Sequence, residues 1–420
     1  MTTQTHLFAW LCVALSASPS SAQTLTIAGA VDEAIQHNLT LIAQRANLSV
    51  ADTQMLTARL RPNPVASFSA DHLDLLGTGF DETNNGGPPE IAFRVDLPIE
   101  RGAKRERRID FASASRALAE AQFADAVRAL RSDVTLACID VLAARATRAL
   151  VADNLRAFEE LARVNRARVT AGSLAPVEAT RSEVARLQFR STAVRADLDL
   201  ATALARLRTL IGRAPADPID LDGNLRVAME TAPELTNVQQ LALATRPDLR
   251  SLELGQARSL ADLRLQEAIG RIDYTIGVEY LRQQGIAGRS NSLGFFVTAP
   301  LPLLNRNQGE IARAMAERDQ VSRQTAAVRA QILSDVDIAY REFTTNRDLV
   351  AAIERDLIQP ATSARDISTY TYRAGGSSLL ELLDAQRAFN DTMQSYLDAQ
   401  AGLRRAVARV NAAVGMEVLR

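Results

Sequence analysis

The side chains of this sequence that could do chemistry are few and scattered. Glu381 and Asp384 are three residues apart, so on a helix they would share one face and could attract cations. His37 and His72 have no cysteine or histidine neighbours, and Cys138 lies among apolar residues. We expect His37 as a helix cap or surface residue and His72 as an interfacial residue at the outer end of a strand. We expect Cys138 as a small buried residue rather than a ligand. The sequence therefore predicts no metal site and no cofactor.

Catalytic and nucleic-acid-binding functions find no support in the composition or the motifs. The sequence contains no P-loop, no G-x-S-x-G and no H-E-x-x-H motif. A formal net charge of −1 over 420 residues lacks the basic excess that is typical of nucleic-acid binders. Two cysteines cannot build a disulfide framework. We therefore expect neither an enzyme nor a nucleic-acid partner.

The first 22 residues have the organisation of a cleavable export signal. An apolar run from Leu7 to Leu15 is followed by Ser20 and Ala22, at the −3 and −1 positions of a small-x-small cleavage site. The mature chain would then start near Gln23. Because no later stretch of ~18 apolar residues exists, we expect no transmembrane helix. An exported chain of this kind would be secreted, periplasmic, or in an outer membrane as a β-barrel.

The rest of the chain is an internal duplication. Short matches recur in the same order at a spacing of 203 or 204 residues: Leu97-Pro98 with Leu301-Pro302, Ala171-Gly172 with Ala374-Gly375, and Ile211-Gly212 with Val414-Gly415. The segment between the halves is rich in proline, aspartate and glycine, which is typical of a linker. We predict a first repeat over residues 23–212, a linker over 213–234 and a second repeat over 235–420.

Each repeat contains two very long helices. Residues 103–169 include no proline or glycine, and apolar residues recur there at alternating spacings of four and three, which indicates a coiled-coil seam. A helix of that length would measure ~100 Å. A compact helical bundle with unrecognised breaks is the alternative. The expected helices cover about residues 102–170, 174–211, 307–373 and 377–414.

Two segments in each repeat alternate with a period of two. In one of them, Ile91, Phe93, Val95 and Leu97 form an apolar face opposite Ala92, Arg94 and Asp96. This pattern fits transmembrane strands, although it also fits a half-buried soluble sheet. Open strand edges do not occur in lipid, so other copies of the chain would have to complete the sheet. The expected strands cover about residues 64–73, 91–98, 272–281 and 292–301.

Specific segments also resemble a known family. Tyr372-Arg373-Ala374-Gly375, followed by Glu381 and Asp384, is similar to the Y-x-x-G turn and acidic residues of the TolC family of outer-membrane efflux ducts. The first-half counterpart, from Arg168 to Glu178, lacks the tyrosine. Pro98–Gly102 and Pro300–Gly309 resemble the CzcC-like branch, which serves heavy-metal efflux pumps of the resistance-nodulation-division class.

The resemblance implies a mostly α-helical chain with a small β part that forms a homotrimer. Its four transmembrane strands per protomer would build a 12-stranded barrel in outer-membrane lipid, and its helical hairpins a 12-helix tunnel across the periplasm. A periplasmic adaptor protein and an inner-membrane pump would be the partners. The resemblance places Glu381 and Asp384 at the periplasmic gate. The helix–helix turns would contact the adaptor through Gly172, Ser173, Glu178, Tyr372, Gly375, Gly376 and Ser377.

Other functions stay open at this point. A duct of the same family could serve drug efflux or type I protein secretion, because the pump chooses the cargo. A soluble periplasmic coiled-coil adaptor or scaffold belongs to a different class. Such adaptors carry one helical hairpin with β-rich end domains, which fits a full duplication poorly.

Overall fold

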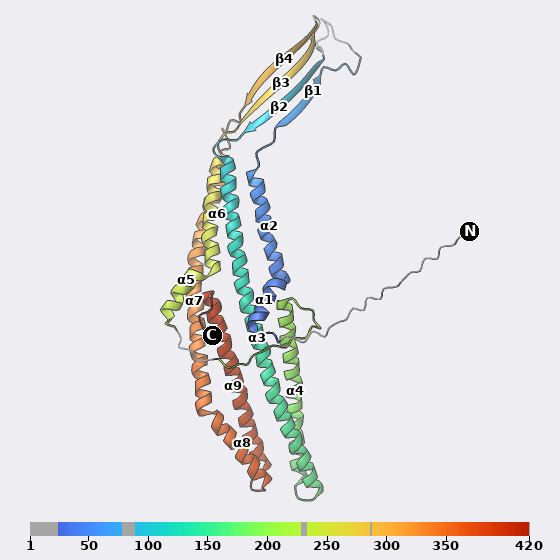
Figure 1. The fold of residues 1–420 in the computed structure, drawn as a ribbon, viewed down its shortest axis with the longest axis vertical. Helices are drawn as coiled ribbons and strands as arrows, with labels where there is room; N and C mark the ends of the chain where they lie inside the picture. The colour runs from blue at the N-terminus through green and yellow to red at the C-terminus, as the bar shows by residue number, and fades with distance from the viewer. Residues whose placement is uncertain (1–23, 78–88, 228–232, 286–287, 420) are drawn as a thin grey trace, which may run out of the picture.

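The computed structural model describes residues 24–77, 89–227, 233–285 and 288–419. The predicted export signal therefore lies outside the described residues. The molecule is a long rod, with all strands at one end and two helix–helix turns at the other (Figure 1). The predicted fold class, mostly α-helical with a small antiparallel sheet, is confirmed.

The duplication is visible as two similar runs of elements. The first half contains α1 (Ile27–His37), α2 (Leu39–Arg59), β1 (Val65–Asp71), β2 (Glu90–Ile99), α3 (Lys104–Thr170) and α4 (Pro176–Ile211). The second half contains α5 (Leu235–Thr245), α6 (Pro247–Ile269), β3 (Tyr274–Gly285), β4 (Gly288–Thr298), α7 (Gln308–Asp356), α8 (Ile358–Arg373) and α9 (Leu379–Val414).

The four strands form one antiparallel sheet in the order β1-β2-β3-β4. The two halves meet between β2 and β3, where Val95 lies opposite Val278. In the described chain β1 and β4 therefore form the two edges of the sheet.

The long helices pack through the seams that the spacing predicted. Along α3 the seam residues Leu130, Val134 and Val141 are buried, and the stripe continues to Val151 and Phe158 near the turn. On α9 the residues Leu382, Tyr396, Leu403 and Val410 are buried at intervals of seven and fourteen. The helices thus form hairpins of α3 with α4 and of α7–α8 with α9.

The short helices α1 and α5 pack beside the long helices at the middle of the rod (Figure 1), a region that we call the waist. A break at Asn38 separates α1 from α2, and a break at Arg246-Pro247 separates α5 from α6. The Asn38 side chain accepts a hydrogen bond from the Leu41 amide at 2.9 Å and donates to the Leu210 carbonyl at 2.9 Å. Arg246 donates to Asp335 at 3.0 Å. The two Asn38 bonds satisfy backbone groups at the start of α2 and the end of α4, and the Arg246 bond holds the second break against α7.

Three features of the elements differ from the sequence-based expectation by more than two residues. The helix expected over 307–373 is interrupted at Leu357, because Pro360 lacks an N–H and its ring disfavours a helical carbonyl at Asp356. The strand expected to reach residue 301 ends at Thr298, two residues before Pro300, which cannot donate to the ladder. The connection expected over 282–291 is mostly strand, since β3 and β4 continue to Gly285 and Gly288.

Within the described ranges, no helix is both long enough and apolar enough to cross a lipid bilayer.

Candidate functional site

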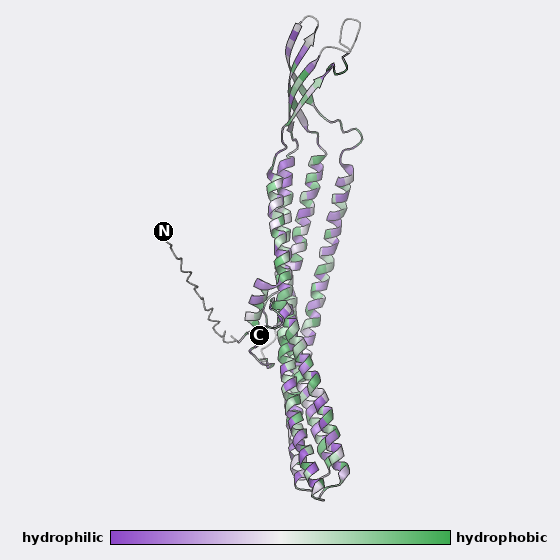
Figure 2. Cartoon of the chain, turned by 90° about the vertical axis from the view of Figure 1, so that its right-hand side faces the viewer, coloured by the Kyte–Doolittle hydropathy of each residue, from purple (hydrophilic) through white to green (hydrophobic). Residues whose placement is uncertain are grey.

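The sheet exposes its apolar face. Along β2 the large residues Ile91, Phe93 and Val95 are exposed, while Arg94 and Asp96 on the other face are half-buried. On the edge strand β4, Phe295 and Val297 are 75% and 73% exposed. Hydrophobic and hydrophilic residues alternate along the strands in Figure 2. A soluble half-buried sheet would cover its apolar face with other elements, whereas here the described chain leaves this face open.

The opposite face of the sheet is polar and internally paired. Arg94 donates from Nε and Nη2 to Oδ1 of Asp96, at 2.9 and 2.8 Å. Gln283 donates to a carboxylate oxygen of Glu90 on the neighbouring strand at 2.5 Å. Glu279 lies directly opposite Arg94 in the register of β2 and β3. This face can therefore line an aqueous space while the other face meets an apolar solvent.

A buried lysine ties the sheet to the rod. Lys104, the only lysine of the chain, is 7% exposed at the start of α3. Its ammonium donates to a carboxylate oxygen of Asp273 at 2.6 Å and to the Arg271 carbonyl at 2.8 Å. The other oxygen of Asp273 accepts from the Arg101 amide at 2.8 Å. Arg101, between β2 and α3, and Lys104, at the start of α3, thus hold the strand–helix junction of the first half against the helix–strand junction between α6 and β3 of the second half.

The two turns at the far end of the rod have the same backbone geometry. Gly172 and Gly375 have φ of +74° and +79°, a left-handed conformation that favours glycine. The following amides, of Ser173 and Gly376, donate back to the carbonyls of Arg168 and Thr371 at 2.9 and 2.8 Å. These bonds form Schellman motifs, which end α3 and α8. A Cβ added at Gly172 or Gly375 would meet nothing within 4 Å, so both turns present open surface.

The two predicted gate carboxylates lie at the start of α9, next to the second turn. The Ser378 hydroxyl accepts a hydrogen bond from the Glu381 amide at 3.3 Å, which caps the helix and places Glu381 in its first turn. Asp384 lies one turn further, 3.8 Å from Nη1 of Arg387. Ser377 contacts the Thr371 hydroxyl at 3.1 Å. Glu381 and Asp384 are both exposed, so the structure leaves them available to ions or to another chain.

Tyr372 does not lie on this open surface, although the resemblance grouped it with the contact turns. It is 6% exposed, and its hydroxyl donates to Oδ1 of Asn165 on α3 at 2.8 Å. Burial raises the pKa of the Tyr372 phenol. The Arg168 guanidinium lies 5.8 Å from the centre of the tyrosine ring. Tyr372 therefore joins the two hairpins close to their turns.

Two further polar groups near this contact lack partners within the described residues. Asn165 is fully buried, and its Nδ2 has no hydrogen-bond acceptor. One carboxylate oxygen of Glu178 is also buried without a donor, while the other accepts from Arg181 at 3.3 Å. Sequence reasoning missed Asn165. Its spacing of seven from Phe158 was the available signal, since it placed a polar residue in the apolar seam.

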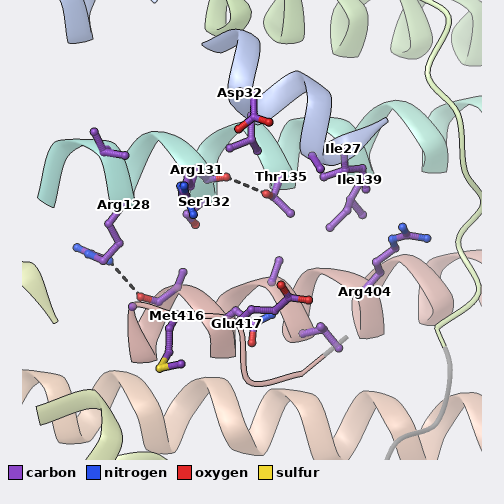
Figure 3. A pocket seen from close by; sticks show the side chains of 18 of the residues that line it. Ile27, Asp32, Arg128, Arg131, Ser132, Thr135, Ile139, Arg404, Met416 and Glu417 are labelled. Atoms are coloured by element: carbon purple, nitrogen blue, oxygen red, sulfur yellow. Dashed lines mark hydrogen bonds between the residues drawn. The ribbon is translucent and has the colours of Figure 1, made fainter. Parts of the chain in front are cut away.

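A cavity of about 670 Å³ lies at the waist between α1, α3 and α9. Figure 3 shows Asp32 on α1, Arg128 and Arg131 on α3, and Arg404 on α9 around it. Arg128 is engaged by the Ala412 carbonyl at 3.2 Å and by Asp125 at 2.8 Å. Among the residues that the structure describes, no group of three or more potential metal-ligating side chains exists.

Comparison with known proteins gives one consistent result. A family model described as outer membrane efflux protein matches residues 30–213 and 238–416. The cobalt-zinc-cadmium resistance protein CzcC of Cupriavidus metallidurans is 26% identical over 402 residues, covering 94% of this chain and 91% of that protein. The nickel and cobalt resistance protein CnrC of the same organism is 26% identical over 311 residues, covering 71% and 70%. A crystal structure of CusC superposes with a TM-score of 0.75 at 17% identity, covering 93% and 92% of the two chains, and thus shares the fold.

Proposed function

The chain belongs to the outer membrane efflux protein family, and on this premise we propose that it is the exit duct of a tripartite pump that expels divalent heavy-metal cations. The observation that carries the proposal is the sheet, which exposes its apolar face and has β1 and β4 as its edges. Large exposed apolar residues are stable where lipid replaces water, and unpaired strand edges are not. Both features call for lipid around the sheet and for further copies of the chain beside it.

Three copies of the chain complete the structure in this proposal. Three sheets of four strands make twelve, in which β4 of one copy pairs with β1 of the next. In the helical rod, α4 lies on one side and α7 and α8 lie on the other (Figure 1). Val194 and Leu198 on α4 are 64% and 65% exposed, and Ile338 on α7 and Ile367 on α8 are 54% and 62% exposed. Each edge would pack against the opposite edge of the next copy, which closes the ring.

In this proposal the far ends of the helical hairpins bind the adaptor protein and form the gate of the tunnel. A periplasmic adaptor would dock on the open surface at Gly172, Ser173, Gly375 and Gly376, with Ser377 and Glu178 nearby. In a trimer, Glu381 and Asp384 would contribute six carboxylates around the narrow end of the tunnel, where they attract cations. The duct itself would be passive and would catalyse no reaction, since an inner-membrane pump of the resistance-nodulation-division class supplies the energy.

The cargo is inferred from the relatives and from charge. CzcC and CnrC are named for resistance to cobalt, zinc, cadmium and nickel, and each is similar to this chain over most of its own length. The polar face of the sheet and the first turns of α9 both carry carboxylates, which favour cations. Drug efflux and protein secretion remain the competing cargos within the same architecture.

The membrane assignment is tested by a pair of arginine substitutions on β4. Phe295→Arg places a charge on the exposed apolar face, and Ser292→Arg places the same charge on the polar face. An arginine facing lipid at mid-depth costs about 2–4 kcal/mol, whereas one facing the lumen is tolerated. We expect Phe295→Arg to lower the amount of trimer in the outer-membrane fraction and Ser292→Arg to leave it unchanged. Equal amounts of both variants in that fraction would contradict the assignment.

The cargo is tested in a strain that lacks the gene. We expect the deletion to lower tolerance to cobalt, zinc or cadmium salts, and the wild-type chain to restore it. Tolerance to dyes and detergents, measured beside the metals, distinguishes drug efflux. A deletion that leaves metal tolerance unchanged and lowers drug tolerance would refute the metal cargo while leaving the duct in place.

A further inference from the structure

The polar face of the sheet contains a recess that two glycines create. Gly277 on β3 lies between Asp96 on β2 and Phe296 on β4 in the register of the sheet. A Cβ at Gly277 would collide with Oδ1 of Asp96 and would approach Nη2 of Arg94 to 3.0 Å. A Cβ at Gly294 would approach the Phe296 ring to 2.9 Å. The space above Gly277 is therefore occupied by side chains of β2, and the space above Gly294 by the Phe296 ring of the same strand.

Those side chains lie flat against the sheet. The Arg94 guanidinium crosses from β2 toward β4, where its central carbon lies 4.2 Å from the centre of the Phe296 ring. Two of its nitrogens donate to the same oxygen of Asp96. Ring stacking holds the guanidinium plane, and the ion pair cancels its charge. The arginine side chain is consequently only 26% exposed on an otherwise open sheet.

The remaining charges on this face are all negative. The register places Asp71, Glu90 and Glu279 on the same face as Arg94, which is the only basic residue there among the described strand positions. Because Asp96 neutralises Arg94, the three other carboxylates determine the sign of the face. An extended Arg94 would instead project a positive charge from each copy into the enclosed space.

We propose that the recess at Gly277 and Gly294 sets the ion selectivity of the pore that the sheet lines. The recess holds Arg94 flat against Asp96 and Phe296, so that the pore presents carboxylates to passing cations. The inference rests on the proposed function, because it requires the polar face to line the pore. It assigns cation preference to the sheet, at the opposite end of the rod from Glu381 and Asp384 (Figure 1).

The test measures the local electrostatic potential at the polar face of the sheet. A cysteine introduced as Ser292→Cys lies on the polar face of β4, two residues from Gly294. Intact cells are treated from outside with a cationic and an anionic methanethiosulfonate reagent, and the two reaction rates are compared. Cells whose chain lacks Ser292→Cys give the background rate. This readout is independent of whether the tips of the helical hairpins are open.

We expect the cationic reagent to react faster with Ser292→Cys. Adding Gly277→Ala pushes Arg94 out of the recess and should lower the cationic-to-anionic rate ratio roughly twofold or more, since one unit charge at ~8 Å in water acts on another by about RT. Adding Phe296→Ala removes the stacking surface without new bulk and should shift the ratio in the same direction. Adding Arg94→Ser to Gly277→Ala should restore the high ratio. Gly309→Ala is the matched control, since its Cβ meets nothing within 4 Å.

The outcomes separate the two proposals. If neither reagent reaches Ser292→Cys while the chain is in the outer membrane, the polar face does not line a pore and the proposed function fails. If both reagents react and the ratio is the same with Gly277→Ala and with Phe296→Ala, the recess does not set the charge and the inference is overturned. If Gly277→Ala does not accumulate, Phe296→Ala decides the question.

Discussion

The buried contact between Tyr372 and Asn165 allows a quantitative test of how the two hairpins are held together. Tyr372→Phe removes one hydroxyl and keeps the ring, so packing against the surrounding apolar cluster of Phe158, Leu379 and Leu382 is preserved. The Asn165 amide then loses the hydrogen bond that it accepts at 2.8 Å. Its Nδ2 already lacks an acceptor within the described chain, so the whole amide becomes an unsatisfied buried group.

The magnitude follows from the burial of Asn165. A fully buried polar group that loses its partner destabilises the folded state by about 1–3 kcal/mol, because no water replaces the bond. If this free energy is lost from the local opening equilibrium of the hairpin ends, the population of the open state rises by about 5- to 150-fold.

Hydrogen exchange measured by mass spectrometry on the intact trimer is the assay. Peptides that cover the end of α8 and the start of α9 should exchange faster by this factor in Tyr372→Phe, while peptides from the waist should not change. Tyr370→Phe is the matched control, since the Tyr370 side chain is 74% exposed on the same helix.

A second substitution separates the lost bond from any other effect of the hydroxyl. Asn165→Leu together with Tyr372→Phe replaces both partners by apolar groups, which is close to neutral when the shapes fit. The double variant should therefore exchange more slowly than Tyr372→Phe alone. Exchange that is unchanged in Tyr372→Phe, or equally fast in Tyr370→Phe, would refute the role of this bond.

Three further predictions concern the tips and the waist. Glu381→Ala with Asp384→Ala should lower cation selectivity and cation block in planar-bilayer recordings; unchanged selectivity and block would remove both residues from the gate. Gly375→Asn should preserve the turn, because asparagine tolerates the left-handed conformation, whereas Gly375→Val should strain it. Loss of export by both, with the trimer still in the membrane, supports an adaptor surface; normal export by Gly375→Asn favours a capping role only. Burial raises the pKa of the Cys138 thiol from 9.0 to about 12, so maleimide at pH 8 should label it only after unfolding. Because the folded state disfavours the thiolate, the contribution of Cys138 to the free energy of unfolding should be complete below pH 9 and should decline from pH 9 toward 12. Cys138→Ala should remove that pH dependence. Rapid labelling of the native protein would contradict the burial of Cys138.

Much of the architecture followed from periodicity, because periodicity reports local geometry directly. The apolar spacing of four and three along residues 103–169 describes a helix with one buried stripe, and α3 is that helix. The alternation at Ile91, Phe93 and Val95 describes a strand with two different faces, and β2 has them. In each case the residues that specify the element lie within it.

The features that escaped sequence analysis join residues far apart in the chain. Asn165 meets Tyr372 across 207 residues. The recess joins Arg94 and Asp96 on β2 to glycines on β3 and β4, and its existence depends on strand register, which no single strand encodes.

By itself, the sequence determined the duplication, the types of the elements and the two faces of each strand, since backbone propensity and side-chain spacing act within a few residues. The tertiary structure alone decided which face of the sheet the chain leaves open, which polar groups are buried between the hairpins, and which side chains the glycines of β3 and β4 accommodate. These properties depend on the distance between atoms that the chain brings together only when it folds, so no local pattern carries them.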